Sequence, residues 1–210
     1  MLAFLATVAV VDGDLRLAFL WLALSTVVDA TDGLLARAVR VRERVPGVDG
    51  SHLDDIVDYL TFVFVPAFLL YHAGRLPVGW GVPVVSAVLV SSVIAFAKSD
   101  AKTSDHFFTG FPSYWNIVAF YLVALGLPPW LNAVILLVLC VLIFVRIGYV
   151  YPSRTPTLRA FTLVLGSAWG ALLVYQMSQL PVTSRRIMLV SLSFPVYYAV
   201  LSLVLHARRE

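Results

Sequence analysis

The segment from Asp29 to Asp58 concentrates charge in a chain that is 60% hydrophobic. It contains seven acidic residues and four arginines, among them two aspartate pairs with helical spacing. Asp29 and Asp32 are three residues apart, and Asp54 and Asp58 are four apart. Since residues at these spacings share one face of a helix, the segment predicts two helices that each present a pair of carboxylates.

The sequence between the pairs favours a turn. Pro46-Gly47 and Asp49-Gly50 are dipeptides typical of turns, which predicts an antiparallel helix pair with the two acidic faces opposed. Four converging carboxylates would repel one another unless their pKa values rose or divalent cations lay between them, and cations are the better account. Because the donors are all oxygen, they favour a hard ion, Mg²⁺ or Mn²⁺, over zinc.

Small residues accompany the first aspartate pair. On a helical wheel Asp29, Asp32, Gly33, Ala36 and Arg37 fall within an arc of roughly 140°. Gly33 and Ala36 leave room for a ligand to approach the backbone, and the guanidinium of Arg37 suits a phosphate. The expected ligand is therefore a metal-bound phosphate.

The rest of the chain predicts a membrane protein. Its mean hydropathy is +0.91, and 210 residues leave room for seven or eight spanning helices at about 20 residues each. We expect an all-α, polytopic integral membrane helical bundle of about eight transmembrane helices, formed by residues 1–210 as a single membrane-embedded domain. The first is short for a span and is expected to be the second half of a truncated helix. The predicted helices are Met1–Val11, Leu15–Arg40, Leu53–Leu70, Val78–Ala97, Tyr114–Leu127, Trp130–Val150, Leu158–Tyr175 and Ile187–Leu205.

The charged segment resembles the signature of the CDP-alcohol phosphatidyltransferase family. That signature reads D-x2-D-G-x2-A-R, a spacer, then G-x3-D-x3-D. The spacer here, Ala38 to Asp49, has twelve residues and is longer than is common in the family; in this it is similar to the bacterial phosphatidylcholine synthase branch. Asp100 to Tyr121 also resembles that branch. The matched positions are Asp29, Asp32, Gly33, Ala36, Arg37, Gly50, Asp54 and Asp58.

The resemblance implies an enzyme that transfers the phosphatidyl group of CDP-diacylglycerol to choline and releases CMP. It implies that Asp29, Asp32 and Asp54 bind Mn²⁺ or Mg²⁺, and that Asp58 shares the metal or acts as base on the acceptor hydroxyl. It also implies that Gly33, Ala36, Arg37 and Gly50 hold the CDP group, and that a homodimer is possible. No nucleic-acid partner is expected, because the net charge of +3 is explained by membrane topology.

Basic residues predict the orientation. If the charged segment is cytoplasmic, eleven of the fifteen basic residues lie on that side and four on the other, as expected in a bacterial inner membrane whose cytoplasmic face carries the active site. The eleven are Arg37, Arg40, Arg42, Arg44, Lys98, Lys102, Arg146, Arg154, Arg159, Arg208 and Arg209, and the four are Arg16, Arg75, Arg185 and Arg186.

Choline, a quaternary ammonium, is best held by aromatic faces. Tyr59, Tyr114 and Trp115 are the candidates near Asp58, although aromatic residues at a membrane interface are ordinarily belt residues. The residues alone do not choose choline over serine, inositol or glycerol phosphate as acceptor. The alternative from another class is a cation transporter, which would carry its acidic site nearer the bilayer midplane and without four neighbouring arginines.

Overall fold

The computed structural model describes residues 1–45, 47–98, 107–150, 155 and 157–207. Pro46 of the predicted turn and four of the basic residues counted above, Lys102, Arg154, Arg208 and Arg209, lie outside these ranges. The elements in chain order are α1 Leu2–Val11, α2 Leu15–Ala38, α3 Val41–Arg44, α4 Gly50–Asp58, the π-helix η1 Tyr59–Phe64, α5 Val65–His72, α6 Gly81–Ala97, β1 Phe107–Thr109, α7 Trp115–Ala124, α8 Pro129–Leu142, β2 Gly148–Val150, α9 Arg159–Ser178, α10 Arg185–Ser191 and α11 Ser193–Ala207.

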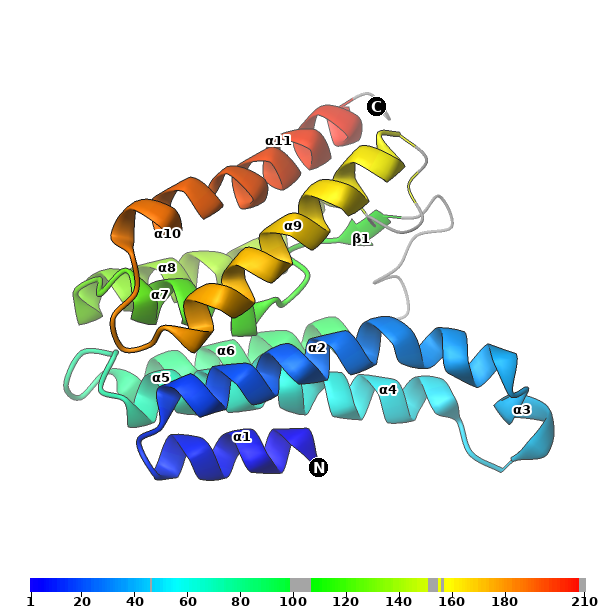
Figure 1. Cartoon of the computed structure of the whole chain (residues 1–210), viewed down its shortest axis with the longest axis horizontal. Helices are drawn as coiled ribbons and strands as arrows, with labels where there is room; N and C mark the ends of the chain where they lie inside the picture. The colour runs from blue at the N-terminus through cyan, green and yellow to red at the C-terminus, as the bar shows by residue number, and fades with distance from the viewer. Residues whose placement is uncertain (46, 99–106, 151–154, 156, 208–210) are drawn as a thin grey trace.

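The helices form a bundle in which α2 and the continuous segment α4–η1–α5 run side by side (Figure 1). On one side of them lies α1, and α9 packs against α2 from the other side. The second helix starts at Leu15 because Asp14 caps it: the Asp14 carboxylate accepts a hydrogen bond from the Leu17 N–H at 2.8 Å.

Three helical segments are long and apolar enough to cross a membrane, namely Leu15–Ala38, Arg159–Ser178 and Arg185–Ala207. Their outward surfaces are apolar: Val164 is 71% exposed and Val190 is 68% exposed. Such exposed apolar residues suit a surface that faces lipid. The helical architecture is confirmed, whereas the count of about eight spans stays a prediction.

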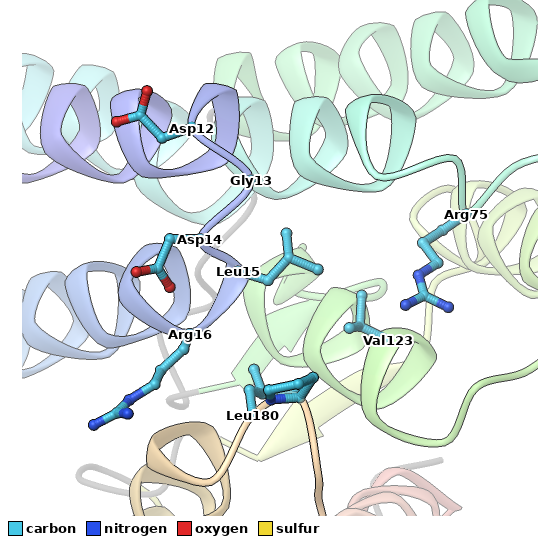
Figure 2. Close-up of a pocket in the computed structure, with 9 residues that line it drawn as sticks. Asp12, Gly13, Asp14, Leu15, Arg16, Arg75, Val123 and Leu180 are labelled. Atoms are coloured by element: carbon cyan, nitrogen blue, oxygen red, sulfur yellow. The ribbon is translucent and has the colours of Figure 1, made fainter.

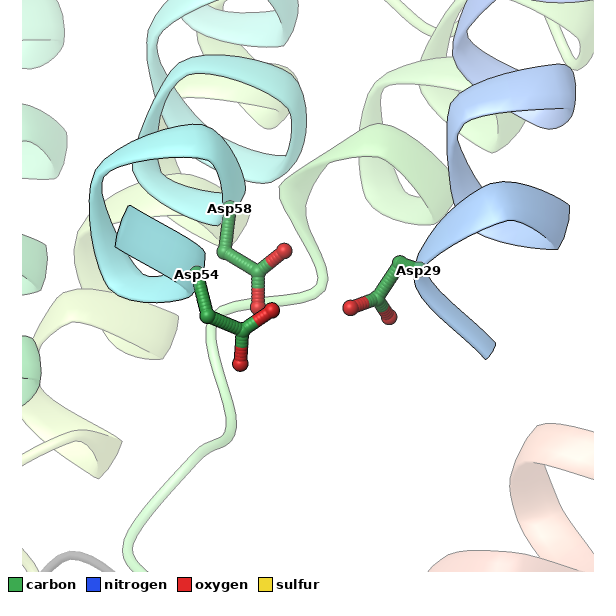
Figure 3. Close-up of side chains that lie close together, drawn as sticks. All are labelled: Asp29, Asp54 and Asp58. Atoms are coloured by element: carbon green, nitrogen blue, oxygen red, sulfur yellow. The ribbon is translucent and has the colours of Figure 1, made fainter. Parts of the chain in front are cut away.

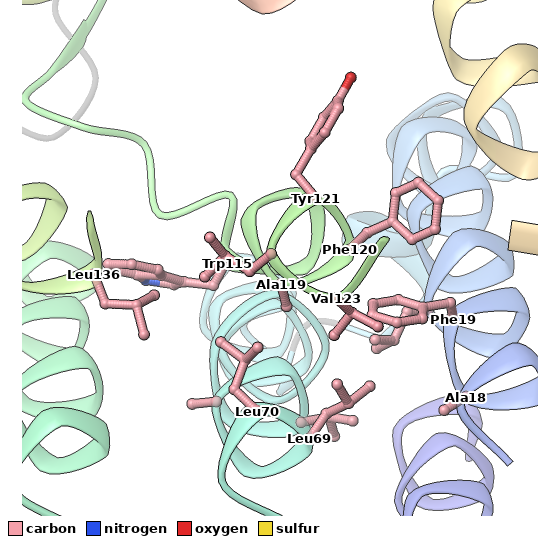
Figure 4. Close-up of a cluster of buried hydrophobic side chains, with 14 of the residues drawn as sticks. Ala18, Phe19, Leu69, Leu70, Trp115, Ala119, Phe120, Tyr121, Val123 and Leu136 are labelled. Carbon is pink, nitrogen blue, oxygen red and sulfur yellow. The ribbon is translucent and has the colours of Figure 1, made fainter. Parts of the chain in front are cut away.

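The core lies where α2, α5 and α7 meet (Figure 4). Phe19 of α2 and Phe120 of α7 are both fully buried, and their rings pack edge to face with centroids 5.2 Å apart. Leu69 of α5 is buried beside them. This packing holds the first half of α2 in place, before the helix reaches Asp29.

A two-stranded ribbon departs from the all-helical prediction. β1 pairs antiparallel with β2, with Phe108 opposite Tyr149. The predicted helix Trp130–Val150 is therefore wrong at its end: α8 stops at Leu142, and the residues from Gly148 to Val150 form a strand instead. The strand is held from the other side as well, because Ser202 of α11 accepts the Val150 N–H at 3.1 Å.

The helix that carries Asp54 and Asp58 changes its hydrogen-bond spacing directly after Asp58. In η1 the backbone takes i→i+5 bonds, and the Val65 N–H bonds to the Leu60 carbonyl. The buried Thr61 hydroxyl donates to the carbonyl of Val57 at 3.0 Å, at the junction where the spacing changes. The predicted third helix is thus one continuous helical segment built of three parts.

Candidate functional site

Three carboxylates meet between α2 and α4. Asp29 comes from α2, and Asp54 and Asp58 lie one turn apart on α4, so all three point into the same space (Figure 3). One oxygen of each carboxylate lies within 4.8 Å of the others, and all three residues are half-buried. Two helices therefore supply three convergent oxygen ligands, as the antiparallel pairing of the acidic faces predicts.

The chemistry of these donors fits a divalent cation. Three like charges at such short range destabilise one another, and partial burial adds to the cost because it removes water from the charged groups. A divalent ion between them offsets both the repulsion and the loss of hydration. Carboxylate oxygens without sulfur or imidazole suit Mg²⁺ or Mn²⁺. The cluster could therefore hold a metal ion.

Asp32 lies outside this cluster and is exposed. On α2 it is displaced from Asp29 by about 60° around the axis and about 4.5 Å along it. The helical wheel places both on one face, but it contains no information on how far along α2 the facing helix α4 reaches. The role of Asp32 as a metal ligand stays a prediction.

Gly33 gives the side chain of Arg37 its position. A Cβ atom at Gly33 would lie 3.3 Å from Arg37 Nη1, which is tighter than an ordinary van der Waals contact. The guanidinium thus lies alongside the glycine, one turn beyond Asp29 on α2. Ala36 and Arg37 are exposed and open to a ligand.

The other predicted nucleotide-binding residue, Gly50, is the first residue of α4 and has open space where a side chain would be. It follows Asp49, whose carboxylate caps α4 by accepting the Ser51 N–H at 2.9 Å and the Ser51 hydroxyl at 2.6 Å. The hydrogen bond from the Ser51 hydroxyl holds the pKa of Asp49 below its usual value, and the backbone N–H groups of Ser51 and His52 add to this effect to a smaller extent. Since a lowered pKa means that the folded state prefers the ionised carboxylate, the cap stabilises the helix at neutral pH and is lost only when acid protonates it.

The loop between α2 and α4 is exposed. Arg40 takes a left-handed backbone conformation with φ of 52° after α2 ends, and α3 follows it. The Arg40 guanidinium lies 3.9 Å from Glu43, with both side chains more than 70% exposed. Such a pair contributes little to stability, so Arg40 remains available to an anion.

A polar contact that the sequence did not indicate ties α7 to the cluster. Asn116 is buried, and its Nδ2 donates to Thr26 Oγ1 at 3.1 Å, three residues before Asp29 on α2. This contact brings the start of α7 close to the carboxylates. The half-buried Tyr114 lies two residues before Asn116, at the N-cap of α7.

The other two aromatic candidates are engaged in packing. Trp115 is 1% exposed, and its Nε1 donates to Ser92 Oγ of α6 at 2.8 Å. The Tyr59 hydroxyl donates to the Leu89 carbonyl at 3.1 Å, and its ring packs edge to face on Phe96. All three aromatic residues stay candidates for the choline site, and Tyr114 is the one next to the contact between α7 and α2.

Comparison with known proteins finds several relatives that are named phosphatidylcholine synthase. The chain is 39% identical over 186 residues to a phosphatidylcholine synthase of Pseudomonas aeruginosa, an alignment that covers 87% of this chain and 78% of the relative. It is 37% identical over 176 residues to a phosphatidylcholine synthase of Rhizobium johnstonii, covering 84% and 73% of the two chains.

A third relative is matched over a shorter stretch. The chain is 49% identical over 137 residues to a phosphatidylcholine synthase of Legionella pneumophila, covering 64% of this chain and 54% of that protein. The chain thus spans little more than half the length of this relative. No family model matches the sequence.

Proposed function

The chain belongs to the bacterial phosphatidylcholine synthase branch of the CDP-alcohol phosphatidyltransferases, and we propose that it transfers the phosphatidyl group of CDP-diacylglycerol to choline with release of CMP. The observation that carries this proposal is the meeting of Asp29, Asp54 and Asp58, three positions of the family signature, within 4.8 Å. A phosphatidyltransferase needs such a site next to the bilayer, because its lipid substrate stays in the membrane.

The carboxylate of Asp58 is the proposed general base. It lies one turn deeper in the bundle than Asp54 and takes the proton of the choline hydroxyl while the hydroxyl oxygen forms a bond to the phosphorus that bears diacylglycerol. The bond from this phosphorus to the bridging oxygen of the pyrophosphate breaks, and CMP leaves with that oxygen. The proton then passes from Asp58 to solvent, so that the products are phosphatidylcholine, CMP and one proton.

Asp29, Asp32, Asp54 and Asp58 are the proposed metal ligands, and Mg²⁺ or Mn²⁺ is the proposed ion. When bound, the metal would neutralise negative charge on the pyrophosphate and on the departing CMP. Gly33, Ala36 and Gly50 leave the backbone accessible, so we assign the CDP group to the space they border.

Arg37 is proposed to bind a phosphate of the CDP group. Arg37→Ala is expected to lower kcat/KM for CDP-diacylglycerol by about tenfold to hundredfold, since a hydrogen bond to a charged group is worth about 1.5–3 kcal/mol. The matched control is Arg40→Ala, because Arg40 is equally basic but matches no signature position and pairs with Glu43 in the loop after α2. Steady-state kinetics with each variant test this, and equal losses in both variants would contradict the assignment.

Tyr114 is proposed to contact the choline ammonium. Tyr114→Leu is expected to raise the apparent KM for choline by about 2- to 30-fold, the range that corresponds to a cation–π contact of about 0.5–2 kcal/mol. The KM for CDP-diacylglycerol should stay near its wild-type value. Tyr114→Phe serves as control because it retains the aromatic face, and a KM for choline unchanged in Tyr114→Leu would move the acceptor pocket elsewhere.

The site is proposed to face the cytoplasm from the inner membrane. Asp29 lies about 21 Å along α2 from the first residue of that helix, in the second half of a membrane-length segment of 24 residues. The basic residues Arg37 and Arg40 follow it at the same end, which agrees with the excess of positive charge on cytoplasmic loops.

The decisive experiment offers the purified full chain CDP-diacylglycerol and, in parallel, choline, serine, inositol and glycerol phosphate, with lipid products identified by mass. Phosphatidylcholine formed only with choline, together with stoichiometric CMP, is the expected result. Another phosphatidyl product would assign another acceptor. Absence of CMP release with all four acceptors would favour the cation-transporter alternative.

A further inference from the structure

A pocket lies at the start of α2, in the half of the helix that does not carry the aspartates. It has a volume of about 430 Å³ and is formed by the turn between α1 and α2, by Arg75 in the loop after α5, by the end of α7, and by Leu180 and Pro181 (Figure 2). A volume in this range suits a small molecule or a lipid headgroup. Nothing in the proposed transfer reaction uses this end of the molecule.

The backbone of Arg75 is fixed in place from both sides. Its N–H donates to the Leu70 carbonyl at 2.9 Å, which closes the end of α5. Its carbonyl accepts a hydrogen bond from Nδ2 of Asn132 at 2.8 Å, and Asn132 is fully buried in α8. The start of the Arg75 side chain is therefore held at a defined point of the pocket wall.

The side chain of Arg75 points into the pocket without a counter-ion. Figure 2 shows the guanidinium on the side of the pocket where Val123 lies, and both residues line the pocket. Its Nε is buried and has no hydrogen-bond partner, and Arg75 forms no ion pair within the part of the chain that the structure describes. A charged group that is partly withdrawn from water and left unpaired is costly, and an oxyanion in the pocket would remove that cost.

The pocket also has the surroundings of a headgroup site. Leu15, Val123 and Leu180 give it apolar walls, which suit the glycerol end of a lipid. Trp80, in the same loop as Arg75, is 63% exposed and is of the type that gathers at membrane interfaces. The pocket lies at the first residue of a membrane-length helix, where headgroups are found.

The residues that line the pocket carry charges of both signs. The Asp14 carboxylate accepts a hydrogen bond from the Leu17 N–H, whereas Asp12 is exposed at the edge of the pocket. With Arg16 and Arg75 balanced by Asp12 and Asp14, the lining disfavours a dianion such as free phosphate. It suits a ligand that combines one phosphodiester charge with an ammonium group.

From this arrangement we propose that the pocket binds the headgroup of a zwitterionic phospholipid of the opposite leaflet. Arg75 donates its forked N–H groups to the phosphodiester, and Asp12 lies on the side of the ammonium. The inference rests on the membrane placement within the proposed function but not on the chemistry at Asp58.

Binding is tested with delipidated full-length protein in detergent, by native mass spectrometry and thermal stability, in the absence of CDP-diacylglycerol and choline. Phosphatidylethanolamine, phosphatidylglycerol and inorganic phosphate are the three probes. Wild type is expected to retain one phosphatidylethanolamine and to be stabilised by it more than by the other two. Arg75→Gln should weaken this binding by about tenfold or more.

Two further variants keep the result interpretable. Arg186→Gln is the matched control, because Arg186 is exposed and is not among the residues that line the pocket, and it should bind as wild type does. Leu15→Trp fills the pocket from α2 and should weaken binding as Arg75→Gln does. Unchanged lipid binding in both Arg75→Gln and Leu15→Trp would overturn the proposal, and stabilisation by inorganic phosphate alone would overturn its lipid identity. A negative result here leaves the transferase assay unaffected, so the two proposals fail separately.

Discussion

Replacing Asp58 with asparagine is expected to lower kcat by about 10²–10⁴-fold, the range associated with a general base. Asparagine keeps the shape of the side chain but cannot accept the proton of the choline hydroxyl. Thermal stability in the absence of metal should not fall, because the change removes one of three like charges that lie within 4.8 Å. Measurements of kcat and of the unfolding temperature on the same preparation check both parts.

The control for this change is Asp55→Asn. Asp55 is the neighbouring acidic residue on α4, half-buried as Asp58 is, but it lies outside the carboxylate cluster and matches no signature position. Its variant should retain near-normal turnover. Near-normal turnover in Asp58→Asn, in a folded preparation, would remove Asp58 from the mechanism.

Removing divalent metal is expected to reduce activity to background, and adding Mg²⁺ or Mn²⁺ should restore it. The metal should also stabilise the fold, by about 2.7 kcal/mol at a concentration 100 times its dissociation constant. Asp29→Asn should lose both the activity and most of this stabilisation. Unfolding curves of chelator-treated protein with and without added metal measure the binding independently of turnover.

The aspartates should behave as one unit under this test. The double variant Asp29→Asn with Asp54→Asn is expected to be about as inactive as either single variant, because residues of one site are not additive. Asp32→Asn shows whether the exposed fourth carboxylate also binds the metal, and we expect a loss of activity comparable to that of Asp29→Asn. If chelation left activity unchanged, the carboxylates would need a role other than metal binding.

The parts of the fold that the sequence predicts well are those with a regular pattern. The apolar pattern predicts a helix from Leu15 to Arg40, and α2 ends at Ala38. The meeting of Asp29 with Asp54 and Asp58 follows from helical spacing and a turn. Periodicity and spacing are local properties, so they can be read from a single chain.

The parts that the sequence does not predict depend on partners far along the chain. Gly148 to Val150 form a strand because Phe107 to Thr109 lie beside them, some forty residues earlier. The burial of Trp115 depends on Ser92 of α6, and the position of Asp32 relative to the cluster depends on the axial offset between two helices. None of these relations leaves a periodic signal.

The π-helical segment η1 sets the direction in which Asp54 and Asp58 point relative to the buried part of the same helix. In an α-helix each residue turns the chain by about 100°, whereas i→i+5 bonding turns it by less per residue, so η1 accommodates about one residue more than an α-helix would over the same rotation. If η1 became regularly α-helical with all its residues, Asp54 and Asp58 would swing away from Asp29 while α5 stayed packed in the core. A one-residue deletion within η1 that restored α-helical spacing would instead leave the carboxylates facing Asp29.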